Sequence, residues 1–492
     1  MKKIPVIIVI AVIFAAQIIS CDLFNDAVTS DGAVKEFNAL DNKKGTFYTL
    51  KAKLLETGKY CTVWAETTAG VSSATAKKVA DEYDTKIHLQ MIDAFGIQNI
   101  KFDGYTFADT MAFADAAGDG DGKLCILLLD IKDNYKKGVN SSYIAGYFYP
   151  YDVFPQTGSF SNRRDMIYID TYPGMEYQNT AFTTLAHEMQ HMMNFMSSFL
   201  YRIYETKTGN TIFPMDTWID EGLSAAAEYV YSGHTLDKIN WYNQNGDIES
   251  NIKSLIDKGN NFFVWGNRED ENMYANLDDY STVYLFFQWL RLQSGGTDIY
   301  KKIISSQYYN QSAITSVFKS DRHGNSYSDW DSILKTWLAA NYINIPNSQY
   351  GYMNDSALSN LRIPAAVSIN STILLSPGEG VYSLMGNSFG MPSQGTNVRY
   401  ASLDKTGVVF NYEAGNGRVL LTYNSDTTFN DDYSKGNPEN GATTGFPIAA
   451  SVTAVSNARS ALPKAPYRTG ISDLFRKPLA FNPEDFKIRN EE

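Results

Sequence analysis

The amino-acid sequence predicts an α+β domain, with an N-terminal sheet and a helical C-terminal part, over residues 46–345, followed by a small all-β domain over residues 350–465. Three observations lead to this fold class. Strand-like runs come first, amphipathic helical patterns follow, and the chain then changes to short alternating runs separated by Gly, Asn, Asp and Pro. The length of 492 residues, with 44% hydrophobic and 20% charged residues, indicates a folded protein of two or three domains.

The N-terminal part contains the strand-like runs. Residues 46–66 predict one or two strands, and residues 123–131 form a continuous apolar run bounded by turn residues, as expected of a buried strand. Further strands are predicted within residues 142–154 and 165–173. Residues 74–96 place apolar side chains every three or four positions, which indicates an amphipathic helix among these strands.

The helical part is predicted to begin with a long helix from Thr180, for which Asn179 or Thr180 is a plausible N-cap. A second helix is predicted near residues 216–231. Thr217 is followed three residues later by Asp220, which resembles a capping box, so we expect Asp220 to have a capping role. The remaining predicted helices cover residues 279–296, which end in a Gly-Gly pair, and residues 330–343.

The first 21 residues have the features of a targeting signal. Two lysines precede an apolar run up to about Ile19, which has signal-peptide proportions and is too short for a comfortable membrane span. Residues 18–21 (Ile-Ile-Ser-Cys) resemble the bacterial lipobox, in which the signal is cut before a cysteine that then carries lipid. We therefore expect a signal peptide over residues 1–20, lipidation of Cys21, and a protein anchored to the membrane outside the cytoplasm, in the bacterial cell envelope. An ordinary secretory signal with an incidental cysteine is the alternative.

Two polar segments flank the predicted domains. Residues 21–45 are expected to be a tether from the lipid, and residues 466–492 a polar tail.

The charge of the chain argues against a nucleic-acid partner. The formal net charge is −12 and no Lys/Arg-rich run is present, whereas phosphate binding requires a basic face. We expect a monomer that does not bind nucleic acid.

Cys61 and Cys125 both lie in apolar, β-branched contexts. Outside the cytoplasm they could form a disulfide, or they could be two buried thiols on neighbouring strands. The sequence leaves both interpretations open.

The stretch TLAHEMQHMMNF carries the chemistry that the sequence indicates most clearly. His187 and His191 are four residues apart, so on a helix they project from the same face and can reach one metal ion. Glu188 follows the first histidine and lies beside the metal, where it can accept a proton from a metal-bound water. This is the HExxH arrangement of zinc hydrolases.

A catalytic zinc needs a third protein ligand and an open position. No histidine follows at the HExxHxxGxxH spacing, so the ligand is expected to be an acid on a following helix. The stretch WIDEGLSAAAEYVY offers Asp220, Glu221 and Glu228.

A wider set of motifs resembles the hyicolysin family of bacterial metallopeptidases, which are glutamate-zincins. The motifs are, in this order, DGDGKLCILLLDIKD, YIAGYFYPYDVF, MIYIDTYPG, TLAHEMQHMMNF and WIDEGLSAAAEY. The resemblance covers about residues 45–345 and is absent from the C-terminal β region.

The resemblance implies a zincin-like metallopeptidase domain that cuts protein or peptide substrates with one catalytic Zn²⁺. His187, His191 and Glu221 would be its ligands and Glu188 its general base. Glu228, two turns beyond Glu221, either orients a ligand histidine or is a solvated helix residue, and the sequence does not decide between these roles.

A second electrophile usually helps to hold the oxyanion in such reactions. Tyr280, Tyr284 and His234 are the candidates, and we select Tyr280 as the predicted catalytic residue, although aromatic residues on a helix are more often core.

The stretch GDGDGK hints at a calcium loop, because Asp119 and Asp121 stand beside Gly122. An EF-hand would need acids where Ala117 and Leu128 stand. A tight turn into the next strand is the preferred interpretation, with calcium as the alternative.

The sequence leaves two other functions open. The chain could be a non-catalytic surface lipoprotein, such as an adhesin or binding module, with a vestigial or structural metal site. Alternatively, it could use zinc for a different hydrolysis.

Overall fold

The structure is a computed structural model that describes residues 32–428 apart from short gaps, together with residues 442–443 and 479–480. The longest gaps cover residues 202–210, 244–253, 264–274 and 410–417. The predicted signal peptide and Cys21 lie outside the described residues, as does most of the predicted tail. In the described part of the chain, no helix is both long and apolar enough to cross a membrane.

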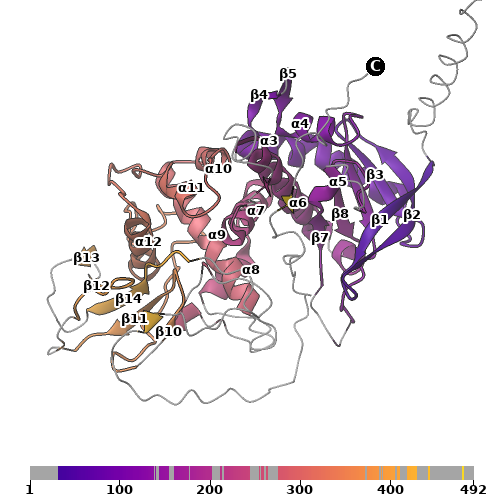
Figure 1. Ribbon diagram of the computed structural model, residues 1–492. Coiled ribbons are helices and arrows are strands. Elements are labelled where there is room, and N and C mark those ends of the chain that lie inside the picture. The colour runs from indigo at the N-terminus through magenta and orange to yellow at the C-terminus, as the bar shows by residue number, and fades with distance from the viewer. Residues whose placement is uncertain are drawn as a thin grey trace, which may run out of the picture.

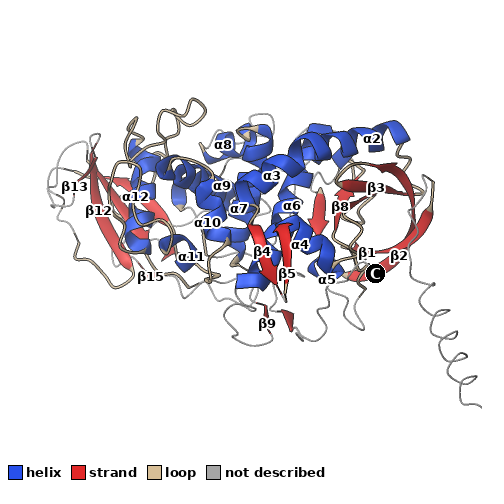
Figure 2. Cartoon of the chain, turned by 90° about the horizontal axis from the view of Figure 1, so that it is seen from above, coloured by secondary structure: helices blue, strands red, loops and turns tan. Residues whose placement is uncertain are grey.

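The described residues form a mixed α+β structure, in agreement with the predicted class. A sheet lies at one end, helices occupy the middle, and a second sheet lies at the other end (Figure 1; Figure 2). The first sheet has six strands in the order β1-β2-β3-β6-β8-β7. Strands β1 to β3 are antiparallel, β3, β6 and β8 are parallel, and β7 is antiparallel to β8. The strands are β1 (Val34–Asp41), β2 (Thr46–Thr57), β3 (Cys61–Glu66), β6 (Leu124–Leu129), β7 (Gly146–Phe148) and β8 (Met166–Asp170).

Strand β1 corrects the predicted tether, because the sheet begins at Val34 and not after residue 45. Its eight residues pair along the whole strand with β2. Phe37, Ala39 and Leu40 are buried. The alternation with Lys35, Glu36 and Asn38 gave this edge strand a polar composition that hid it in the sequence.

Helices cover one face of the first sheet. The predicted helix at residues 74–96 is α2 (Ser73–Glu82) and α3 (His88–Phe95), joined by a π-helical turn at Tyr83–Ile87. These helices, α4 (Thr110–Ala117) and α6 (Gln178–Phe199) share one hydrophobic core with the sheet. A second, smaller core on the opposite face consists mostly of strand residues. A hairpin of β4 (Gln98–Phe102) and β5 (Tyr105–Asp109) and the short α5 (Pro150–Val153) complete this part.

Cys61 and Cys125 are both buried free thiols. The parallel register pairs Cys61 with Leu124 and Thr62 with Cys125. Because successive side chains point to opposite faces, Cys61 belongs to the larger core and Cys125 to the smaller one. Of the two interpretations, the structure therefore has buried thiols on neighbouring strands, and burial raises the pKa of both.

The helical part follows the first sheet. Helix α7 packs against α6 and also against α9. Trp218 of α7 inserts into a cluster of aromatic rings. The helices are α7 (Thr217–Ser232), α8 (Leu236–Tyr242), α9 (Ala275–Ser294), α10 (Asp298–Ile304), α11 (Ser312–Thr315) and α12 (Trp330–Ile343).

The C-terminal sheet has the order β11-β14-β12-β13. Its strands are short and follow residue 350, as the sequence predicted. The sheet packs on α12, and Tyr382 donates a hydrogen bond of 2.6 Å to the carbonyl of Leu338. Because Tyr382 and Leu421 belong to the larger core, this sheet continues the helical part and has no separate core on that face. Its strands are β11 (Gly380–Leu384), β12 (Val398–Asp404), β13 (Gly407–Val409) and β14 (Val419–Asn424).

Two pairs of two-residue strands join distant segments. Strand β10 (Leu374–Leu375) pairs with β15 (Ala442–Thr443), and β16 (Leu479–Ala480) pairs with β9 (Thr211–Ile212). Residues 479–480 of the predicted tail are therefore attached to the first half of the chain.

Candidate metal centre

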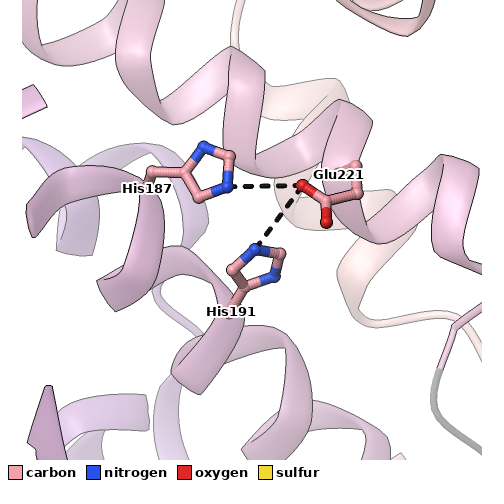
Figure 3. A group of neighbouring side chains, drawn as sticks. All are labelled: His187, His191 and Glu221. Carbon is pink, nitrogen blue, oxygen red and sulfur yellow. Dashed lines mark ion pairs between the residues drawn. The ribbon is translucent and has the colours of Figure 1, made fainter. Parts of the chain in front are cut away.

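The two histidines and one glutamate come from two helices that pack side by side. His187 and His191 lie one turn apart on α6, and Glu221 lies in the first part of α7 (Figure 3). Their candidate ligand atoms lie within 4.8 Å of one another. The three residues that the resemblance assigned as metal ligands are therefore brought together by the fold.

The sequence of α7 explains the close approach. A Cβ atom at Gly222 would overlap the ring of Phe287 on α9, so glycine is needed where α7 meets that helix. Ala225, Ala226 and Ala227 are fully buried small residues. This composition holds α7, and with it Glu221, in a tightly packed position between α6 and α9.

The distances fit a tetrahedral ion. Oε2 of Glu221 lies 3.3 Å from Nε2 of His187 and 3.7 Å from Nε2 of His191. Two ligands of a tetrahedral zinc, each bonded at about 2.1 Å, are about 3.4 Å apart. The side chains of His187 and Glu221 are nearly inaccessible, and that of His191 is 16% exposed, so His191 is the most accessible of the three.

The other ring nitrogens of both histidines are held by acids of α7. Nδ1 of His187 lies 2.8 Å from Oε1 of Glu228, and Nδ1 of His191 lies 2.9 Å from Oδ2 of Asp220. A carboxylate that accepts a hydrogen bond from Nδ1 leaves Nε2 unprotonated and directed at a metal. Both Nε2 atoms in fact face Glu221.

This arrangement decides between the interpretations of two acids. Glu228 is 2% exposed, so it is not a solvated helix residue. The expected capping role of Asp220 is wrong, because Asp216 is the N-cap residue of α7 and the carboxylate of Asp220 is directed at α6. The carboxylate of Asp220 contacts His191 and Asn194 on α6 instead of capping α7.

Further residues hold these acids in place, and sequence reasoning missed them. Lys238 of α8 forms an ion pair with Oε2 of Glu228, and Asn194 donates a hydrogen bond to Asp220. Ser224 hydrogen-bonds to Gln190 and lies 3.1 Å from Nδ1 of His191. Helical spacing could have indicated Asn194, three residues beyond His191, whereas Lys238 has no sequence signal.

The charges around His191 favour a cation. Burial acts to lower the pKa of this imidazole, but Asp220, Glu221 and Glu188 together raise it to about 10. Several carboxylates thus concentrate negative charge on one buried point. An ion of charge +2 bound by two imidazoles and a carboxylate would offset this charge, so the donor set fits zinc.

Glu188 is 6% exposed and lies on α6 directly after His187. Its charge contributes to the raised pKa of His191, which places the carboxylate within electrostatic reach of that ring. Its role as the general base stays a prediction.

Two of the three candidate electrophiles, Tyr284 and His234, contact each other. The hydroxyl of Tyr284 lies 3.1 Å from Nδ1 of His234, whose Nε2 lies 2.8 Å from Asp355. These contacts join Tyr284 and His234 to each other and to Asp355. Tyr280 is partly buried on α9 against the larger core, and its catalytic role stays a prediction.

Glu228 is the acid that holds Nδ1 of His187. Glu228→Gln is expected to weaken zinc binding by about 10–100-fold, because glutamine accepts the Nδ1 hydrogen bond without the negative charge. Zinc affinity measured by competition with a chromophoric chelator checks this. Glu36→Gln, an exposed change on β1, is the control. An affinity equal to that of the control would show that Glu228 does not support His187.

Comparison with known proteins gives one informative similarity. The chain is 30% identical over 279 residues to the neutral metalloprotease ShpI of Staphylococcus hyicus, and the alignment covers 55% of this chain and 54% of that protein. The chain thus spans about half the length of the curated relative that it matches. No protein-family model matches the chain.

Proposed function

We propose that the chain is a zinc-dependent endopeptidase of the glutamate-zincin type, related to the hyicolysin family. The observation that carries this proposal is the convergence of both Nε2 atoms on Oε2 of Glu221, with both Nδ1 atoms held by carboxylates. The similarity to a protein named a neutral metalloprotease supports it independently.

His187, His191 and Glu221 would hold the ion and leave a fourth position for water or substrate. Bound zinc lowers the pKa of a coordinated water to about 7 and polarises the scissile carbonyl. Glu188 would accept the proton of the attacking water and then transfer it to the leaving amine nitrogen, so that one water is consumed for each peptide bond cut. Tyr280 is proposed to stabilise the oxyanion.

Metal analysis combined with digestion of a peptide library tests the function. The expected result is about one zinc per chain and cleavage that stops when a chelator removes the metal. A chain that binds no zinc and cuts nothing in the library would be a non-catalytic binding protein instead. Zinc without peptide cleavage would indicate a different hydrolysis.

We also propose that the protein is lipid-anchored through Cys21 outside the cytoplasm of a bacterial cell. The lipobox-like sequence before Cys21 supports this. Cys21→Ser is expected to move the protein from the membrane fraction to the soluble fraction and to prevent incorporation of labelled fatty acid. Unchanged membrane association and labelling would contradict the anchor.

A further inference from the structure

A second group of acids shares no residue with the metal centre. Asp115 lies near the end of α4, Asp119 lies in the following turn, and Asp165 immediately precedes β8. One carboxylate oxygen from each lies within 4.8 Å of the others. Three segments of the chain therefore direct negative charge to one place.

Arg164 is a cation that the described ion pairs bring to these acids. Nη1 of Arg164 lies 2.6 Å from Asp119 and 3.8 Å from Asp121, a fourth carboxylate at the edge of the group. The ammonium of nearby Lys123 donates instead to the backbone carbonyls of residues 58 and 59. The described ion pairs thus join this guanidinium to two of the four carboxyl groups.

Two oxygens of the group are buried without a hydrogen-bond partner. Asp165 is 1% exposed and its Oδ1 has none, and Oδ1 of Asp119 is also buried and unpartnered. Burial, followed by repulsion from Asp115, Asp119 and Asp121, raises the pKa of Asp165 well above its usual range. A buried carboxylate in this position needs a proton or a bound cation to offset the cost of burial.

The donor atoms identify the kind of cation. Only carboxylate oxygens are present, and hard divalent cations take oxygen ligands, whereas zinc prefers imidazole and thiolate. Calcium takes about six to eight oxygen ligands in flexible geometry, whereas Mg²⁺ usually binds one or two carboxylates and keeps several waters. Three carboxylates whose oxygens lie within 4.8 Å of one another therefore suit calcium.

We propose that Asp115, Asp119 and Asp165 bind one calcium ion. The ligands do not follow the EF-hand spacing, which is why the loop at residues 119–122 alone argued against calcium. The preferred tight turn is present, since Gly120 and Gly122 have φ values of 71° and 77°. The turn presents Asp119, and the sheet supplies Asp165 from another part of the sequence.

The bound ion would join the end of α4 to the start of β8. Gly118 permits this approach, because a Cβ atom there would lie 2.5 Å from the backbone nitrogen of Asp165. The carbonyl of Asp165 also accepts the hydrogen bond of Cys125, at the start of the β6–β8 pairing. Calcium is therefore expected to stabilise the first sheet.

Calcium titration of the zinc-loaded, full-length protein tests the proposal. Calorimetry is expected to show one site per chain with Kd between about 10⁻⁶ and 10⁻³ M, and calcium is expected to raise the Tm. Asp165→Asn is expected to weaken binding at least about 100-fold and to remove the rise in Tm, while its Tm without calcium equals or exceeds that of the wild type.

A second variant and a control keep the test decisive. Asp115→Asn can still accept the hydrogen bond from Gly122, which is 2.8 Å long, so its fold is expected to be retained while one negative charge of the site is lost. Asp93→Asn, an exposed change on α3, is expected to bind like the wild type. Absence of binding at 10 mM calcium (about tenfold above the weakest expected Kd), unchanged binding in Asp165→Asn and Asp115→Asn, or tighter binding of Mg²⁺ would each overturn the proposal. Zinc content measured in every sample separates this outcome from failure of the proposed peptidase site.

Discussion

Glu188→Gln is expected to lower kcat for peptide hydrolysis by about 10²–10⁴-fold while about one zinc per chain is retained. Glutamine has nearly the same shape as glutamate but cannot accept a proton from the attacking water. His187, His191 and Glu221 are unchanged in this variant, so the ion would stay bound. Paired measurement of kcat and of metal content separates loss of the base from loss of the metal.

The control for this prediction is Glu36→Gln, the same chemical change at an exposed position on β1. It is expected to match the wild type in both measurements. A Glu188→Gln variant that cuts peptides at the wild-type rate would exclude Glu188 as the base. Loss of zinc together with activity would instead give Glu188 a part in holding the metal.

The elements that depend on local pattern were predictable from the sequence. Strands β6 and β8 are buried along their whole length, and each read as an apolar run between turn residues. Helix α6 was predicted to begin at Thr180 and begins two residues earlier, at Gln178. Strand β1 and the β4–β5 hairpin were missed, since their partly polar strands become recognisable only through their partners.

The candidate ligands were also predictable, because HExxH spacing fixes two side chains on one face of a helix. The supporting residues were not. Asp220 had an apparent local role at the start of α7, and only the packing of α7 against α6 shows that it contacts His191. Lys238 reaches Glu228 from α8, and Asp165 meets Asp119 through the sheet. Contacts of this kind depend on tertiary structure and leave no spacing in the sequence.

Glu221→Ala is expected to reduce bound zinc to less than about one tenth of an ion per chain after dialysis, and to abolish peptide hydrolysis. The carboxylate of Glu221 faces Nε2 of both histidines, at 3.3 and 3.7 Å. Without it two imidazoles remain, which is one ligand fewer than a catalytic zinc site needs. Metal analysis and a peptide assay on the same samples measure both effects.

Thermal unfolding adds a readout that does not depend on activity. A metal that binds only the folded state raises the Tm, so chelation is expected to lower the Tm of the wild type and of Glu36→Ala. In calcium-free buffer, the Tm of Glu221→Ala is expected to be the same with and without the chelator, because little zinc is bound to remove. If Glu221→Ala kept a full zinc ion and the same chelator sensitivity as the wild type, Glu221 would not be a ligand. Asp220, the acid beside it on α7 that holds His191, would then be the first residue to test as the third ligand.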